Sequence, residues 1–149
     1  MLLGGYFGTW ARAEEIWDLP LDPEVMREAG LTFGCGIVGV LGAGTCGVSA
    51  AARIMRFMAR ESAAQCGPCV YGLDALGSAV TRVATGHARG DDLQRIERLV
   101  GITAGRGACH HPDGAVQHMA SALDVFGDEF QHHARKGSCS TTGGGPGVG

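Results

Sequence analysis

The chain has 149 residues and 45% hydrophobic content, enough to bury one core with a small satellite unit. Its formal net charge is −3, and the scattered Lys and Arg residues form no basic stripe, so we do not expect nucleic acid as a partner. Met1-Leu-Leu lacks the charged start of a signal peptide, so we expect a cytoplasmic protein. In that reducing compartment, the six cysteines are expected to serve metal binding or redox chemistry rather than disulfides.

Residues 1–45 carry the signals of strands and turns. Gly4-Gly-Tyr-Phe-Gly-Thr-Trp10 places aromatic residues between glycines, which predicts a tight, closely packed turn. Asp22 followed by Pro23 predicts the start of a short helix, and Gly30 predicts its end.

A glycine-rich apolar stretch follows. Residues 34–43 predict a buried strand in which Cys35 is a small packed thiol. The uncharged run over residues 29–52 is long enough to cross a bilayer, but its glycines disfavour a helix. We therefore expect no transmembrane segment.

From residue 46 onward, apolar residues recur at helical spacing, which predicts four helices with short connections. The first runs from Cys46 to Ala64, the second opens near Pro68, the third begins at Asp91 or Asp92, and the fourth is capped by Asp113. The sequence thus predicts an α+β chain with a helical bundle over residues 46–136. Residues 137–149 form a Gly-rich tail that we expect to be disordered, Cys139 included.

Cys66-Gly-Pro-Cys69 is the strongest local signal, because two cysteines at this spacing can bind one metal centre. Three interpretations compete. A thioredoxin-like dithiol is disfavoured because the motif follows a predicted helix rather than a strand. A structural Cys₃His zinc module would add Cys109 and either His110 or His111. An iron–sulfur cluster would use Cys66, Cys69 and Cys109.

Several separated motifs together resemble one family. Glu61-Ser-Ala-Ala-Gln-Cys-Gly-Pro-Cys69 is similar to the Glu-Ser-Cys-Gly-x-Cys-x-Pro-Cys signature of the flavoprotein, NADH-binding subunit of respiratory complex I. Gly105-Arg-Gly-Ala-Cys109 resembles the segment with that family's distant cysteine, and Phe126-Gly-Asp-Glu-Phe130 resembles the end of its last bundle helix. Residues 1–45 resemble the end of its soluble-ligand-binding β-grasp domain.

This resemblance implies a [4Fe–4S] cluster that takes electrons from FMN after NADH has reduced it. The FMN and NADH sites of that family lie in an upstream domain without an equivalent here. The implied function is an electron-transfer module of an NADH dehydrogenase, peripheral to a membrane complex. Its implied partners are the FMN/NADH domain and other electron-transfer subunits or a ferredoxin-like protein.

The sequence departs from the family at one ligand. The first of the four family cysteines falls on Ala63, which has no ligand atom. The fourth corner would then be open, as in a [3Fe–4S] cluster, or would be filled by water, His110, His111 or Cys46. The residues alone do not rank these alternatives.

The remaining cysteines and histidines have simpler expected roles. We expect Cys46 to be a packed thiol rather than a ligand. We expect three histidines of the last helix to be solvated: His118, His132 and His133.

Overall fold

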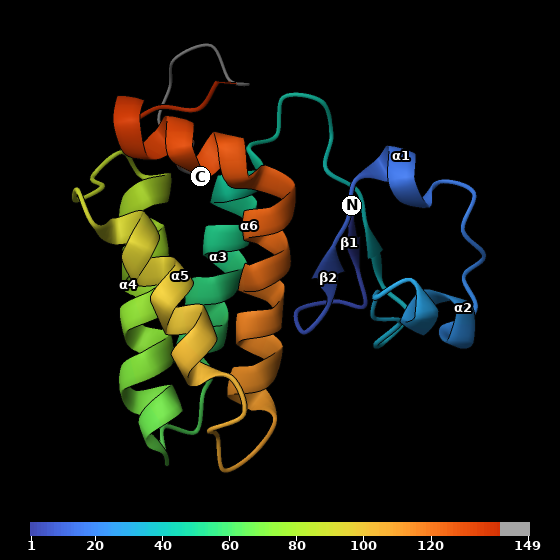
Figure 1. Cartoon of the computed structure of the whole chain (residues 1–149), viewed down its shortest axis with the longest axis horizontal. Coiled ribbons are helices and arrows are strands. Elements are labelled where there is room, and N and C mark those ends of the chain that lie inside the picture. Colours follow the sequence, from blue (N-terminus) through green and yellow to red (C-terminus); the bar gives the residue numbers. More distant parts are fainter. Residues whose placement is uncertain (141–149) are drawn as a thin grey trace.

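The computed structural model describes residues 1–140 of the chain. It is a mixed structure, mostly helical, with one small three-stranded sheet, which agrees with the expected α+β class. Figure 1 shows the sheet with two short helices on one side and the longer helices on the other. That the first part is a β-grasp remnant and the second a four-helix bundle remain predictions.

The sheet is formed by three two-residue strands in the order β2-β1-β3, all antiparallel: β1 (Leu2–Leu3), β2 (Thr9–Trp10) and β3 (Val38–Gly39). The turn between β1 and β2 is tight, as predicted, and the Gly8 N–H donates to the Gly5 carbonyl at 2.8 Å. Gly4 adopts φ +88° there, and a Cβ at this position would lie 2.6 Å from the Thr32 carbonyl oxygen. This turn therefore requires glycine.

The expected buried strand over residues 34–43 is wrong, because only Val38–Gly39 pairs with β1. Ile37 and Val40 are 55% and 71% exposed. Gly34 and Gly36 have φ of +51° and +75°, so this segment turns instead of extending. Cys35 is accordingly exposed rather than packed, and its thiol donates to the Gly4 carbonyl at 3.4 Å.

Two short helices complete this part of the chain, α1 (Ala13–Ile16) and α2 (Pro23–Glu28). The Asp22 carboxylate caps α2 by accepting the N–H groups of Glu24 and Val25 at 2.9 and 3.1 Å. Gly30 follows with φ +73°. Both predicted ends of this helix are confirmed.

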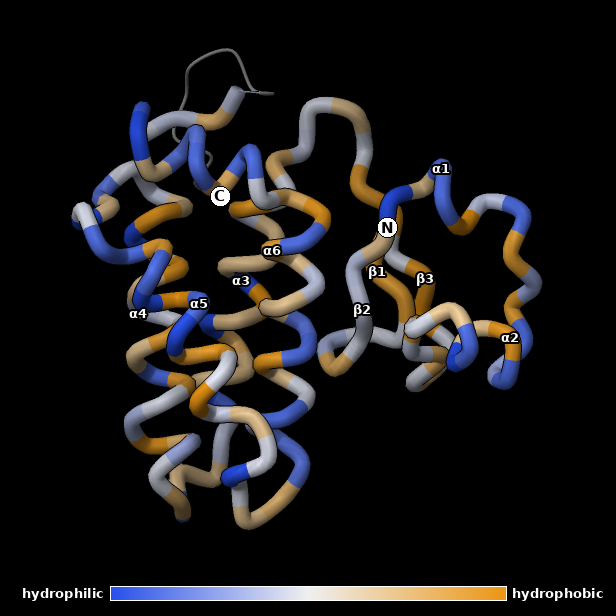
Figure 2. The backbone as a smooth tube through the Cα atoms, viewed as in Figure 1, coloured by the Kyte–Doolittle hydropathy of each residue, from blue (hydrophilic) through white to orange (hydrophobic). Residues whose placement is uncertain are grey.

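The longer helices form where the apolar spacing predicted them, except that the first ends at Arg60 rather than Ala64, whose φ is +49°. They are α3 (Gly47–Arg60), a π-helical turn η1 (Pro68–Leu73) that leads into α4 (Asp74–Ala84), α5 (Asp92–Thr103) and α6 (His111–Lys136). Helix α3 packs against α4 and α6, and α5 packs against the same two helices. Hydrophobic and hydrophilic residues alternate along each of them, as Figure 2 shows. The apolar side chains form the core, including Met55, Leu76, Val80, Ile96, Met119 and Phe130.

Helix α6 differs from the prediction at its start and contains a kink. It begins at His111, and Asp113 does not cap it; the Asp113 carboxylate instead accepts the Gly105 N–H at 2.7 Å. Phe126 has non-helical φ and ψ of −114° and 19°. Its ring lies 2.5 Å from where a Gly47 Cβ would be. The ring also makes an edge contact with Trp10, with 5.2 Å between the ring centroids. The kinked residue thus inserts its ring between α3 and the sheet.

Two of the three histidines expected in solvent are buried, so that expectation is wrong for His118 and His133. His118 Nε2 accepts the Trp10 indole N–H at 3.4 Å, and Ser121 Oγ accepts the Trp10 backbone N–H at 3.0 Å. Because Trp10 lies on β2, His118 joins the sheet to α6.

Within residues 1–140, no helix has the length and apolar character needed to cross a membrane.

Candidate metal centre

Two loops meet at one end of the helical part. The connection from α3 to η1 carries Cys66, and the connection from α5 to α6 carries Cys109; Figure 1 shows both connections at the lower end. Helix α3 runs toward this end and α6 leaves it. The fold therefore brings together segments that are some 40 residues apart in sequence.

The Cys-x-x-Cys turn is built by the start of η1. Pro68 occupies the first position of the π-helical turn, where a missing N–H costs nothing. The Cys66 carbonyl accepts the N–H groups of Cys69 and Val70 at 3.1 and 3.0 Å. Cys69 is buried, Cys66 half-buried and Cys109 exposed. A single π-helical turn is a common feature of functional sites in helical proteins.

The electrostatics of the two neighbouring thiols differ. The backbone N–H of Ala108 lowers the pKa of Cys66, helped by the N–H and thiol of Cys69. The pKa of Cys69 is raised by burial, by its hydrogen bond to Cys66 and by the charges of Cys66 and Cys109. Cys66 therefore ionises first, with Cys69 as its donor.

These interactions also locate the three sulfurs relative to one another. Ala108, which reaches Cys66, directly precedes Cys109, and the Cys109 charge acts on Cys69. The hydroxyl of Ser62 counteracts part of the increase in the Cys69 pKa. Three thiols from two loops, with amide and hydroxyl donors nearby, are a donor set that suits an iron–sulfur cluster.

The candidates for a fourth ligand lie in different surroundings. Ala63 is exposed in the same loop. His110 is exposed, and its Nδ1 lies 3.5 Å from Asp113 Oδ2. His111 is engaged elsewhere: its Nε2 lies 2.8 Å from the Met58 carbonyl oxygen, and its ring makes an edge contact with Phe7.

Cys46 is not brought to this end. It is the N-cap residue of α3, whereas Cys66 follows the C-terminus of the same helix. The 14 residues of α3 separate the two positions by about 20 Å. The structure thus leaves Cys46 outside the group around Cys66.

Sequence reasoning missed Ser62 and the Ala108 N–H, because nothing in a serine or an alanine signals a donor to sulfur. The thioredoxin-like interpretation finds no supporting context, since α3 rather than a strand precedes the motif.

Comparison with known proteins identifies this part of the chain. The family described as "NADH-ubiquinone oxidoreductase-F iron-sulfur binding region" matches residues 49–133. The F 2 subunit of NADH-quinone oxidoreductase from Rhizobium meliloti is 32% identical over 122 residues, covering 82% of this chain and 29% of that protein. The F subunit of NADH-quinone oxidoreductase from Mycobacterium bovis is 30% identical over 126 residues, covering 85% of this chain and 28% of that protein.

The F subunit of the same enzyme from Escherichia coli is 30% identical over 128 residues, covering 85% of this chain and 29% of its own length. The chain thus spans less than a third of the length of these curated relatives. The family match begins within α3 and ends within α6, so it contains Cys66, Cys69 and Cys109. Since the match covers more than half of the chain, the protein belongs to the NADH-ubiquinone oxidoreductase-F iron–sulfur binding region family.

Proposed function

We propose that Cys66, Cys69 and Cys109 bind an iron–sulfur cluster and that the chain is an electron-transfer module of an NADH dehydrogenase. The observation that carries the proposal is the meeting of two loops, where the Ala108 N–H reaches Cys66 and the Cys109 charge acts on Cys69. The family match over residues 49–133 supports the same cofactor.

A bound iron–sulfur cluster would supply one-electron transfer at this end of the helices. The chain would contribute ligands and their surroundings. Cys66 loses its proton more readily than Cys69, because the Ala108 N–H stabilises the Cys66 thiolate. The Ser62 hydroxyl stabilises negative charge on Cys69 in the same way. Such donors to sulfur raise the reduction potential of a cluster relative to a site without them.

The proposed cluster would be a [4Fe–4S] centre held by Cys66, Cys69 and Cys109, with one iron that has no cysteine ligand because Ala63 offers none. Support comes from the exposure of Ala63 and from the engagement of His111 with Met58 and Phe7. A [3Fe–4S] centre is the form expected if that iron is lost, and His110 is the alternative side chain for the fourth corner.

The wider assignment is also a proposal. Residues 1–45 would be the β-grasp remnant and residues 46–136 the four-helix bundle of the complex I flavoprotein subunit. The FMN and NADH sites would lie in a domain outside this chain, and electrons would pass from FMN to the cluster. The partners would be that domain and other electron-transfer subunits or a ferredoxin-like protein, in the cytoplasm at the periphery of a membrane complex.

Anaerobic reconstitution with iron and sulfide tests the cluster. We expect a brown protein with broad absorption in the visible range. Electron paramagnetic resonance spectra of the reduced and oxidised forms then identify the cluster type. Cys69→Ser should abolish the absorption, whereas Cys35→Ser should keep it, because the Cys35 thiol donates to the Gly4 carbonyl and is not one of the proposed ligands. A colourless protein that binds one zinc through the same cysteines would replace the proposal with the Cys₃His module.

A further inference from the structure

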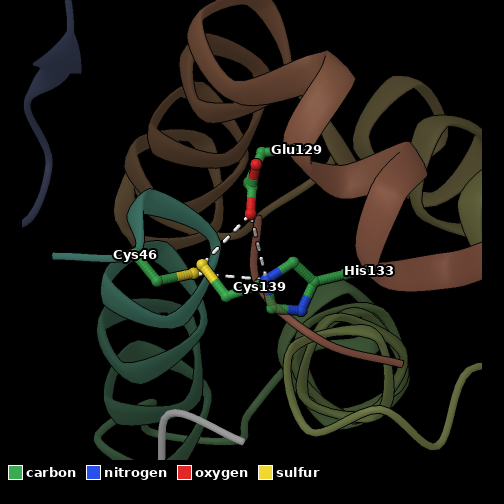
Figure 3. Close-up of side chains that lie close together, drawn as sticks. All are labelled: Cys46, Glu129, His133 and Cys139. Carbon is green, nitrogen blue, oxygen red and sulfur yellow. Dashed lines mark hydrogen bonds and ion pairs between the residues drawn. The ribbon is translucent and has the colours of Figure 1, made fainter. Parts of the chain in front are cut away.

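A second group of metal-binding side chains lies at the opposite end of the helices. It consists of Cys46, Glu129, His133 and Cys139, whose ligand atoms all lie within 4.8 Å of one another. Figure 3 shows the four side chains pointing toward one another from three different segments. Among residues 1–140, no other set of three or more such side chains is gathered so closely.

The local structure explains how three segments reach one point. Cys46 is the N-cap residue of α3, and its sulfur accepts the Ser49 N–H at 3.3 Å. Glu129 and His133 lie one turn apart on α6, at the i, i+4 spacing that places two side chains on one helix face.

Cys139 arrives from a reversal of the chain after α6. Gly137 ends the helix with φ +69°, and its N–H donates to the His133 carbonyl at 2.8 Å. The reversal packs on the loop between α4 and α5, where a Cβ on Gly86 would lie 2.4 Å from the Gly137 carbonyl oxygen. The sequence predicts Cys139 in a disordered tail, but the reversal directs it inward.

The four groups are shielded from solvent. Cys46, Cys139 and His133 are 5%, 4% and 1% exposed, and the Glu129 side chain is 17% exposed. Three groups that can carry negative charge thus share a small buried volume with one imidazole. Without a counter-charge, such an arrangement is costly once the acids ionise.

Their polar atoms contact one another directly. His133 Nε2 lies 3.3 Å from Cys46 Sγ and 3.5 Å from Glu129 Oε1, and the Cys139 thiol donates to the same oxygen at 3.1 Å. In a tetrahedral zinc site, bonds of about 2.0–2.3 Å place the ligand atoms about 3.3–3.8 Å apart. The observed separations therefore need only small side-chain adjustments to surround one ion.

Further contacts orient the ligands from outside. The Ser140 N–H donates to Glu129 Oε1 at 2.8 Å, and the Ser140 hydroxyl donates to the other carboxylate oxygen. Hydrogen bonds of this type fix the direction of a ligating carboxylate. The carboxylate is thus held toward His133 and Cys139 by the chain itself.

We propose that Cys46, Glu129, His133 and Cys139 form a closed structural site for a divalent metal ion, with Zn²⁺ as its ion. Two thiolates, one imidazole and one carboxylate are all zinc ligands, and four protein ligands without an open position are typical of structural sites. The ion would join the start of α3 to the C-terminal part of α6 and to the returning chain. This site is separate from Cys66, Cys69 and Cys109.

The test measures zinc and iron separately on the full-length chain after anaerobic reconstitution with iron and sulfide and addition of Zn²⁺. We expect one tightly bound zinc per chain in addition to the cluster iron. Cys139→Ser should weaken zinc binding at least tenfold and leave the cluster absorption unchanged, whereas Cys69→Ser should do the reverse. Cys35→Ser should change neither. Co²⁺ in place of Zn²⁺ should give thiolate-to-cobalt absorption that disappears in Cys139→Ser.

Three outcomes would overturn the proposal. The first is no zinc retained against a chelator by the unmodified chain. The second is zinc retention that Cys139→Ser does not change. The third is a disulfide between Cys46 and Cys139 in protein purified with reductant, seen by mass spectrometry as a mass lower by two hydrogen atoms. If Cys139→Ser fails to fold, His133→Gln in the same zinc and cobalt measurements decides between these outcomes. Failure of the cluster at Cys66 would leave the zinc result intact.

Discussion

Cys66 and Cys69 are three positions apart, yet their thiols differ in acidity. The Ala108 N–H lowers the pKa of Cys66, whereas burial raises that of Cys69. The difference arises from contacts with the other loop and from depth, neither of which appears in the Cys-x-x-Cys pattern. The resemblance names these two cysteines as proposed ligands, but the sequence does not show that Cys66 ionises before Cys69.

Ala63→Cys is expected to supply the missing fourth ligand, because position 63 repeats the spacing between Cys66 and Cys69 in the same exposed loop. An added thiolate should slow the loss of iron in air and lower the reduction potential of the cluster. Absorbance decay in air and a redox titration measure both effects. Gln65→Cys adds a thiol to the same loop at a different spacing and should reproduce neither. An unchanged decay rate in Ala63→Cys would mean that His110 or another group already fills the corner.

His118 is expected to make stability depend on pH. Burial lowers its pKa from 6.5 to about 4, and a hydrogen bond with the Ala51 backbone opposes part of this decrease. The unfolded chain binds a proton as pH falls below 6.5, but the folded chain binds it only near 4. The stabilisation is therefore complete above pH 6.5 and is lost progressively down to about 4.

Urea unfolding should show a loss of about 2 kcal/mol between pH 7 and pH 5 from this residue. His118→Gln, which retains an acceptor for the Trp10 indole, should remove most of that dependence. His87→Gln, at an exposed position, should retain the dependence of the parent. Equal pH profiles for the parent and His118→Gln would contradict this assignment.

At the scale of elements, apolar spacing predicted the long helices because each buries one face against its neighbours. The same reasoning failed for residues 34–43. An apolar run forms a strand only where a backbone partner lies along it. In the described residues that partner is β1, which pairs with Val38–Gly39 alone. The Asp113 cap failed because its carboxylate has a competing partner, Gly105, that is distant in sequence.

Gly47→Ala is expected to destabilise the contact between α3 and α6. The added methyl group would overlap the Phe126 ring, which Trp10 holds from the other side. Overpacking of this kind costs about 1–3 kcal/mol, which thermal or urea unfolding can measure. Gly101→Ala in α5 meets no atom within 4 Å and should be neutral or stabilising by about 0.5–1 kcal/mol. A neutral Gly47→Ala would show that the ring can move without loss.

For the whole molecule, the family resemblance located the proposed cluster, whereas no sequence pattern indicated the proposed zinc site. Cys46, Glu129, His133 and Cys139 come from three segments, and only the spacing of Glu129 and His133 hints at a shared helix face. The glycine, serine and threonine residues around Cys139 predict a tail. Composition does not reveal that Gly137 turns the chain back. Residues 141–149 of the predicted tail lie outside the described residues.

The isolated chain is expected not to oxidise NADH, because the residues provide no phosphate-binding loop for a dinucleotide or flavin. Calorimetry with NADH at micromolar protein should give no binding signal, before and after reconstitution of the cluster. The reconstituted chain should nevertheless accept electrons from a chemical reductant such as dithionite. NADH binding without any added domain would contradict the proposed relay role.

The hydrogen bond from the Gly105 N–H to the Asp113 carboxylate closes the loop that contains Cys109. A loop held closed by a hydrogen bond has lost part of its conformational freedom before any ligand arrives. Cys109 is thereby held at a high effective concentration relative to the pair Cys66 and Cys69. If the pair held a cluster, Cys109 would need little further ordering to act as its third ligand.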